Sequence, residues 1–168
     1  EQAHIFMAAN TIGIQNKGFY AFMTAVHILG GSFDSRLNRI LSIDKGLTYD
    51  ISMYVQEGKD NSMVFLQTAV EELRSALDVI TQICKSAEKD WSDPQIKKGI
   101  YNINFEFLTS FMTGRRNLIH MEENWFFRDN AKPPNSLSPY DKVTISDVRT
   151  ALESIKTLQW FTVVLAHP

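Results

Sequence analysis

The chain has a single cysteine, Cys84, among its 168 residues. One cysteine cannot form an intramolecular disulfide, and it cannot build a zinc site of the cysteine type. Cys84 falls on the apolar side of a predicted helix, where a cysteine usually acts as a small core hydrophobe. The sequence therefore excludes a disulfide-stabilised scaffold and leaves the redox compartment open.

Excess charge of one sign and long apolar runs are also missing. The chain has 17 basic and 19 acidic residues, so its net charge of −2 provides no broad cationic field for nucleic acid or anionic lipid. No apolar run approaches the roughly 20 residues of a membrane helix. The first ten residues, from Glu1, are typical of a strand rather than a signal peptide. We expect residues 1–168 to form a single domain, cut from a longer protein or left by processing, with no nucleic-acid or membrane partner.

Motifs that carry catalytic chemistry are absent as well. The sequence has no Gly-x-Ser-x-Gly nucleophile elbow and no phosphate-binding glycine loop. A hydrolytic zinc site needs two histidines one helical turn apart, a third ligand and a general base. The nearest approach is His120-Met-Glu-Glu-Asn124, where Asn124 stands in place of the second histidine. We interpret His120 and Glu123 as ordinary helical residues, and predict no metal site and no catalytic residue in this chain.

What the sequence does contain is a succession of strand and helix signals. Two of the predicted strands flank a turn at residues 57–61 and should form a hairpin. Strands in a hairpin, with helices grouped on one face, predict an α+β domain of two layers. The predicted strands are 4–9, 48–55, 62–67 and 160–166, and the predicted helices are 19–29, 34–41, 68–87, 94–112, 118–127 and 146–155.

Three local patterns make sharper predictions. Thr68-Ala-Val-Glu71 reads as a capping box, which predicts that a helix begins at Thr68. The helix 94–112 carries two apolar stripes, so we expect it to be buried on two sides. The strand 48–55 alternates, which predicts one face bearing Tyr49 and Ile51 together with Met53 and Val55. The segment 129–139, with three prolines, is predicted to be a loop.

The segment from Leu29 to Tyr54 is the most specific in the chain. It reads Leu-Gly-Gly-Ser-Phe-Asp-Ser-Arg-Leu, followed by Lys-Gly-Leu-Thr-Tyr, and it resembles the corresponding segment of the pitrilysin/insulinase-type (M16) zinc peptidases. The resemblance is to the C-terminal, zinc-free half-domain of that family, and it extends over nearly the whole chain. It implies the antiparallel two-layer metallohydrolase fold shared with LuxS and the mitochondrial processing peptidase.

The resemblance also implies a function. Such peptidases enclose a chamber between paired halves, in one chain or in two subunits, and only one half binds zinc. This chain would be the non-catalytic half, which closes the chamber and helps to bind the peptide substrate, with zinc in the partner half-domain. Tyr49 matches the family's substrate-binding tyrosine. The family's arginine, seven residues earlier, is replaced by Ser42, and the nearest arginine is Arg39, so the expected substrate-binding residues are Tyr49 and Arg39.

Two other functions stay open at this stage. The same fold occurs in catalytically silent core-type subunits of respiratory complexes, and the loss of arginine at Ser42 favours such a structural or interaction module. An autonomous enzyme with an unrecognised spatial site would instead need a concave pocket with convergent polar groups in this chain. For a bacterial protein the compartment would be periplasmic or cytoplasmic.

Overall fold

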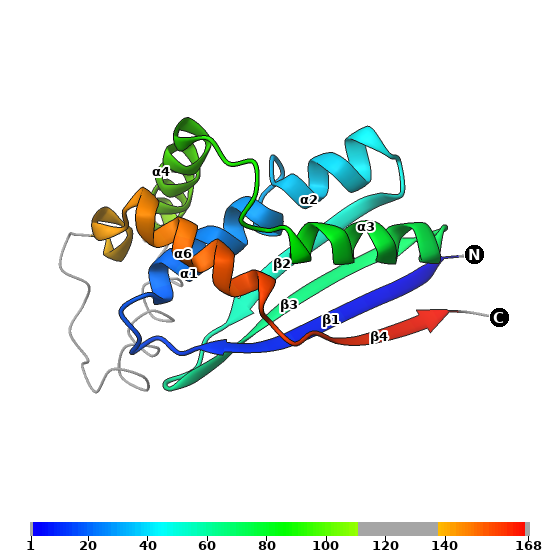
Figure 1. Cartoon of the computed structure of the whole chain (residues 1–168), viewed down its shortest axis with the longest axis horizontal. Coiled ribbons are helices and arrows are strands. Elements are labelled where there is room, and N and C mark those ends of the chain that lie inside the picture. The colour runs from blue at the N-terminus through cyan, green and yellow to red at the C-terminus, as the bar shows by residue number, and fades with distance from the viewer. Residues whose placement is uncertain (1, 111–137, 167–168) are drawn as a thin grey trace.

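Four antiparallel strands form one layer of the domain, and helices form the second layer on one face of the sheet (Figure 1). The computed structural model describes residues 2–110 and 138–166. This arrangement confirms the predicted α+β fold with two layers. The strands are β1 (Ala3–Ile12), β2 (Thr48–Gln56), β3 (Asn61–Val70) and β4 (Phe161–Ala166), and the main helices are α1 (Phe19–Val26), α2 (Arg36–Asn38), α3 (Leu73–Lys85), α4 (Asp93–Ser110) and α6 (Ile145–Lys156).

The strand order in the sheet is β2-β3-β1-β4. The predicted hairpin is confirmed, since β2 and β3 pair directly. The first strand lies inside the sheet and pairs with β3 from Ala3 opposite Val70 to Ile12 opposite Asn61. It also pairs with β4, the last strand of the chain. The two ends of the chain therefore lie side by side at one end of the sheet (Figure 1).

Alternate residues of the strands supply the sheet's half of the core. Ile5 and Met7 of β1 and Val64 and Leu66 of β3 are buried against the helices. From the helix layer, α1, α3 and α6 contribute further side chains that are almost fully buried. These are Phe22, Ala25, Ala76, Ile80, Val148, Leu152 and Ile155. Burial of one face of the sheet against these helices is the main contribution to the stability of the domain.

The predicted capping box at Thr68 is wrong. Thr68 and Ala69 lie in β3, and α3 begins only at Leu73. Its N-cap residue is Glu72, whose side chain makes no capping hydrogen bond. The strand continues because Thr68 is buried at 6% exposure and donates its hydroxyl to the Asp50 carbonyl of β2, 2.7 Å away. Tertiary pairing thus overrides the local helix signal.

A real capping box opens α6 instead, two residues before the predicted start at Ser146. The Thr144 hydroxyl accepts a hydrogen bond from the Asp147 backbone N–H, and the Asp147 carboxylate accepts one from the Thr144 N–H. The Thr144 hydroxyl also lies 2.6 Å from the Asp147 carboxylate, and this contact, together with the bond from the Thr144 N–H, holds the pKa of Asp147 below its ordinary value. They fix the point at which the chain enters α6 and, through it, β4.

Helix α4 differs from its prediction of two-sided burial. One stripe is buried and packs on the core through Ile96, Gly99 and Ile103. The other stripe, which includes Tyr101 and Phe105, is exposed. The predicted helix 118–127, with His120 and Glu123, lies outside the described residues.

Candidate functional site

The segment between α1 and β2 is shaped by a close approach at Gly30. Helix α1 continues into a π-helical turn, His27–Gly31, which lies over β2. A Cβ at Gly30 would lie 2.7 Å from the Met53 Cβ and 2.7 Å from Leu37 Cδ1, closer than side-chain atoms pack. Only glycine lets this turn approach the strand so closely. Gly30 therefore sets the distance between the helix layer and β2.

A second glycine turns the chain into β2. After α2, the π-helical segment Arg39–Asp44 ends, and Gly46 adopts φ +64°, the left-handed region that glycine occupies at no steric cost. The Gly46 N–H donates to the Ser42 carbonyl, and the Leu47 N–H donates to the Leu41 carbonyl at 2.7 Å. These bonds terminate the helical segment and direct the next residues into the strand.

Strand β2 begins with a β-bulge that changes the direction of Tyr49. Thr48 pairs with Val70, but Ile51 already pairs with Thr68, so Tyr49 and Asp50 together stand opposite one residue of β3. The predicted alternation, with Tyr49 on the same face as Ile51, is therefore wrong at its first position. Beyond the bulge it is confirmed, because Ile51 and Met53 face the core. The extra residue leaves Tyr49 pointing out of the domain.

Buried hydroxyls hold the bulge in place. The Oγ1 atoms of Thr48 and Thr68 lie 2.8 Å apart, and both residues are almost fully buried. The Thr48 hydroxyl also lies 2.8 Å from the Ala69 carbonyl and 2.9 Å from the Asp50 carbonyl. The Asp50 N–H in turn donates to Thr48 Oγ1 at 3.2 Å. These contacts satisfy backbone groups that the bulge removes from the regular ladder.

The two residues predicted from the sequence lie on the surface of this segment. Tyr49 is 93% exposed, and among the described residues no hydrogen bond or ring contact engages it. Arg39 is also exposed, and its Nε lies 3.9 Å from Asp44 Oδ2, the length of a loose ion pair. Within the described part of the chain, no hydrogen bond or cation–π contact joins Arg39 to Tyr49. Both side chains are therefore free to reorient toward a ligand.

His27 is a residue of this segment that the sequence analysis did not identify as a candidate. It is 7% exposed and lies at the start of the π-helical turn. Its Nδ1 lies 3.8 Å from Glu106 Oε2 on α4, and its Nε2 is buried without a hydrogen-bond partner among the described residues. Burial lowers the pKa of His27, while the negative charges of Glu106 and Asp34 partly oppose this effect.

The described parts of the chain, 2–110 and 138–166, contain no recognisable site for hydrolysis. No group of three or more His, Cys, Asp or Glu side chains there could hold a metal ion. Cys84 is 3% exposed, and burial raises its pKa to about 12, so it stays a protonated thiol at neutral pH. None of the helices in these ranges is long and apolar enough to cross a membrane.

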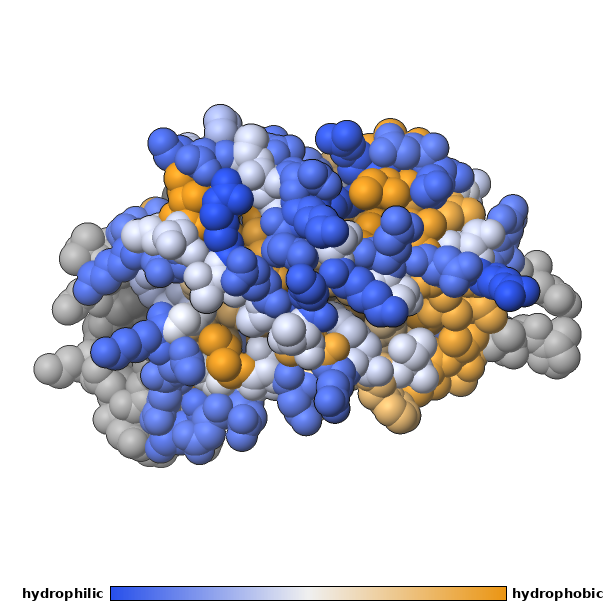
Figure 2. Space-filling model, viewed as in Figure 1, coloured by the Kyte–Doolittle hydropathy of each residue, from blue (hydrophilic) through white to orange (hydrophobic). Residues whose placement is uncertain are grey.

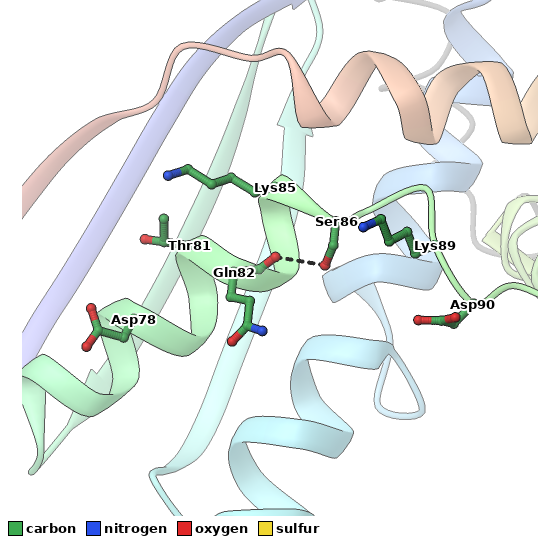
Figure 3. A pocket seen from close by; sticks show the side chains of 7 residues that line it. All are labelled: Asp78, Thr81, Gln82, Lys85, Ser86, Lys89 and Asp90. Atoms are coloured by element: carbon green, nitrogen blue, oxygen red, sulfur yellow. Dashed lines mark hydrogen bonds between the residues drawn. The ribbon is translucent and has the colours of Figure 1, made fainter.

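One open hollow lies along the outer side of α3 and the loop that follows it (Figure 3). Its lining is polar, but the charged groups do not converge. Asp78 and Asp90 lie at opposite ends, and Lys85 points away from Asp90. The Ser86 hydroxyl donates to the Gln82 carbonyl at 2.8 Å, so it is satisfied by its own helix. This hollow offers no activated nucleophile and does not support an autonomous enzyme.

Comparison with known proteins places this arrangement in a family. The family model described as "Peptidase M16 inactive domain" matches residues 1–97, which include the close approach at Gly30 and the bulge at Tyr49. The chain belongs to the peptidase M16 inactive domain family. The family resemblance drawn from residues 29–54 is thereby confirmed.

Individual relatives are consistent with this family assignment. A Bacillus subtilis (strain 168) protein named "Uncharacterized zinc protease YmxG" is 26% identical over 92 residues, which are 54% of this chain and 22% of that protein. A structure described as the peptidase M16 inactive domain from Pseudomonas fluorescens superposes with a TM-score of 0.74 at 16% identity. It matches 96% of this chain and 40% of that one.

A structure of Complex III2 from Candida albicans contains a chain of the same fold. It superposes with a TM-score of 0.80 at 12% identity, over 97% of this chain and 42% of that one. At such low identity the likeness shows the fold alone. This chain therefore spans less than half the length of these relatives.

Proposed function

We propose that this domain is the non-catalytic half of an M16-type zinc peptidase, spanning residues 1–168, and that it closes the substrate chamber and binds peptide through Tyr49. The zinc ion and the general base would belong to a second half, in the same polypeptide or in another subunit. The family match carries the first part of the proposal, and the exposed Tyr49 at the bulge supports the second.

The geometry around Tyr49 suits a peptide ligand. Its ring projects from the start of β2, which is an edge strand of the sheet. An exposed ring offers an apolar face to a substrate side chain and a hydroxyl to a substrate carbonyl. The bulge holds the backbone at Tyr49 in place, so binding has to order only the side chain, which lowers the entropy cost relative to a residue on a mobile loop.

Arg39 is the second proposed contact. Its ion pair with Asp44 is exposed and long, and such pairs contribute about 0–1 kcal/mol, so little energy opposes its release. A released guanidinium can donate to substrate carbonyls or to a carboxylate. Ser42, at the usual position of the arginine, is too short to perform this role.

The test is peptide cleavage by the full parent protein. We expect Tyr49→Ala to lower kcat/KM by about 3- to 10-fold, the range for loss of one aromatic contact. Tyr49→Phe removes only the hydroxyl, so its activity distinguishes the contribution of the hydroxyl to binding from that of the ring. Tyr101→Ala removes an exposed tyrosine from α4 and is the matched control, with no expected effect. Equal activity of Tyr49→Ala and the wild type would contradict peptide binding by Tyr49.

A structural module is the second candidate function. Ser42 in place of arginine favours it, and so does the likeness to a chain of Complex III2. A parent protein that assembles with its second half but cleaves no peptide would favour this alternative. Cleavage that depends on Tyr49 would exclude it.

A further inference from the structure

Helix α4 is attached to the domain by little buried surface. It lies at the outside of the helix layer, where its main contacts are with α1, α6, the π-helical turn His27–Gly31 and the short helix Pro139–Lys142 (Figure 1). Of its 18 residues, three are buried: Ile96, Gly99 and Ile103. Figure 2 shows hydrophilic residues over much of α4, with apolar surface exposed among them. A helix that buries so few side chains belongs to the least stable part of a fold.

Two ion pairs join the first half of α4 to its neighbours. The Asp93 carboxylate accepts from Arg149 Nη2 of α6 at 2.8 Å, and Lys98 Nζ donates to Asp34 Oδ2 at 2.5 Å. All four side chains are exposed, and exposed ion pairs contribute little to stability. The attachment of α4 therefore depends mainly on the few contacts beneath its buried stripe.

The second half of α4 lies over His27. After Ile103 the helix has no buried residue, and the Asn104 amide donates to Asp141 Oδ1 at 2.8 Å. Glu106 is the residue of α4 that faces His27, with its Oε2 3.8 Å from the imidazole Nδ1. This separation is too long for a hydrogen bond. The attached helix thus provides His27 with a nearby charge but with no hydrogen-bond acceptor.

A protonated His27 would have a buried donor without an acceptor. A neutral imidazole has one N–H and a protonated imidazole has two. His27 is 7% exposed, and its Nε2 has no hydrogen-bond partner in the part of the chain that the structure describes. A buried donor without an acceptor destabilises the state that contains it. The attached position of α4 therefore disfavours the protonated form.

The charged groups around His27 do not reverse this preference. Glu106 of α4 and Asp34 of the loop after the turn both attract a proton to the imidazole, but Asp34 is already paired with Lys98. Burial outweighs both carboxylates, so the pKa of His27 lies below its ordinary value of 6.5. Tyr140, beneath the end of α4, stays neutral because burial raises its pKa.

We propose that α4 is a pH-dependent element of this domain: acidification opens residues 99–110 from the π-helical turn, while the sheet and helices α1, α3 and α6 stay folded. In the open form water reaches His27, and the imidazole takes up a proton that the closed form excludes. Because one proton binds on opening, the equilibrium constant for opening increases as the pH falls. The proposal requires neither zinc nor peptide cleavage, so its test is separate from that of the proposed function.

The π-helical turn should respond together with α4. A Cβ at Gly99 would lie 2.1 Å from Ile28 Cγ2, so the helix and the turn are in direct contact at this point. On its other side the same turn packs through Gly30 against Met53 of β2. Opening of α4 removes the first of these contacts and leaves the second. Residues 27–31 therefore lose cover when α4 opens, although β2 stays in the sheet.

Hydrogen exchange followed by mass spectrometry in the full parent protein tests this proposal. Exchange is measured at pH 7.5 and 5.5, and each rate is divided by that of the unfolded protein at the same pH. Uptake of one proton by a group with an ordinary pKa of 6.5 can increase opening by at most about tenfold between these values. The hydrogen bond from Lys98 keeps the pKa of Asp34 low, so Asp34 stays ionised over this range.

We expect the normalised exchange of residues 99–110 to rise at least about threefold on acidification, and that of α3, residues 73–85, to stay constant. Residues 27–31 should follow α4. A smaller rise in 99–110 would overturn the proposal, because α4 would then not respond to the proton. An equal rise in α3 would also overturn it, because the whole domain would then be unfolding.

Three variants identify the group that binds the proton. His27→Gln keeps a polar side chain that takes up no proton, so the response of α4 should disappear. His4→Gln removes an exposed histidine of β1 and is the matched control, with the full response expected. Glu106→Gln leaves the buried imidazole unchanged and removes the nearest negative charge, so its response should be at least as large as that of the wild type.

Exchange in α3 shows whether each variant is folded. A response that persists in a folded His27→Gln protein, or one that is lost in His4→Gln, would overturn the assignment to His27. A smaller response in Glu106→Gln would contradict it from the side of α4, in a protein whose buried histidine is intact.

Discussion

The hydroxyls of Thr48 and Thr68 lie 2.8 Å apart between β2 and β3, at the bulge that turns Tyr49 outward. Neither residue is exposed enough to contact a ligand. Their contribution to function is therefore indirect, because they determine the backbone path that presents Tyr49.

Removal of one hydroxyl should weaken the bulge. We expect Thr68→Val to lower the free energy of unfolding by about 1–3 kcal/mol, since the Asp50 carbonyl loses a buried donor. Thr68→Ser keeps the hydroxyl and should lose less. Urea unfolding measures both variants, and a Thr68→Val protein as stable as the wild type would show that the buried hydroxyl does not hold the bulge.

The contact at Gly30 should tolerate no side chain. We expect Gly30→Ala to cost about 1–3 kcal/mol, because its Cβ would collide with Met53 and Leu37 and force the π-helical turn away from β2. Gly46→Asn is the control, since its site is open and asparagine tolerates positive φ. Thermal unfolding compares the two. Equal stability of Gly30→Ala and the wild type would contradict the packing described here.

Stability should depend on pH through His27. Its pKa in the folded domain lies below the ordinary value of 6.5, so in this range the unfolded chain binds more protons. The contribution of His27 to stability is complete above pH 6.5 and is lost as the pH falls through that value toward its folded pKa. We expect His27→Leu to flatten the dependence of unfolding free energy on pH in this window.

Glu106→Gln should instead strengthen the pH dependence that arises from His27. It removes the nearest negative charge, so the pKa of His27 should fall further and the loss of stability on acidification should become steeper. Urea titrations at several pH values measure both variants. An unchanged slope in His27→Leu would show that another group causes the dependence.

Sequence reasoning succeeded where local pattern and tertiary structure agree. Strands β1 and β4 were predicted from short apolar runs and helix α1 from the helical spacing of its apolar residues, and the segment around Gly30 identified the family. It failed where tertiary contacts overrule local signals. Thr68 has a capping-box pattern, yet its hydroxyl bonds across the sheet. The bulge at Tyr49 also could not be predicted, because strand alternation counts residues and a bulge adds one without any local signature.

The exposed stripe of α4 could not be predicted from the sequence either. Apolar periodicity shows which residues seek burial, but it does not show whether the partner lies within the chain. Tyr101 and Phe105 were therefore assigned to the core, although they are exposed in this domain. The roles of Tyr49 and Arg39 stay predictions until substrate binding is measured.

Zinc content and peptide cleavage, measured on this domain alone and again with the zinc-bearing half, test the central claim most directly. We predict that the domain alone binds no stoichiometric zinc and cleaves no peptide. The assembled halves should hold one zinc ion per pair and cleave peptide in a manner that depends on Tyr49. Stoichiometric zinc with turnover by the domain alone would contradict the account.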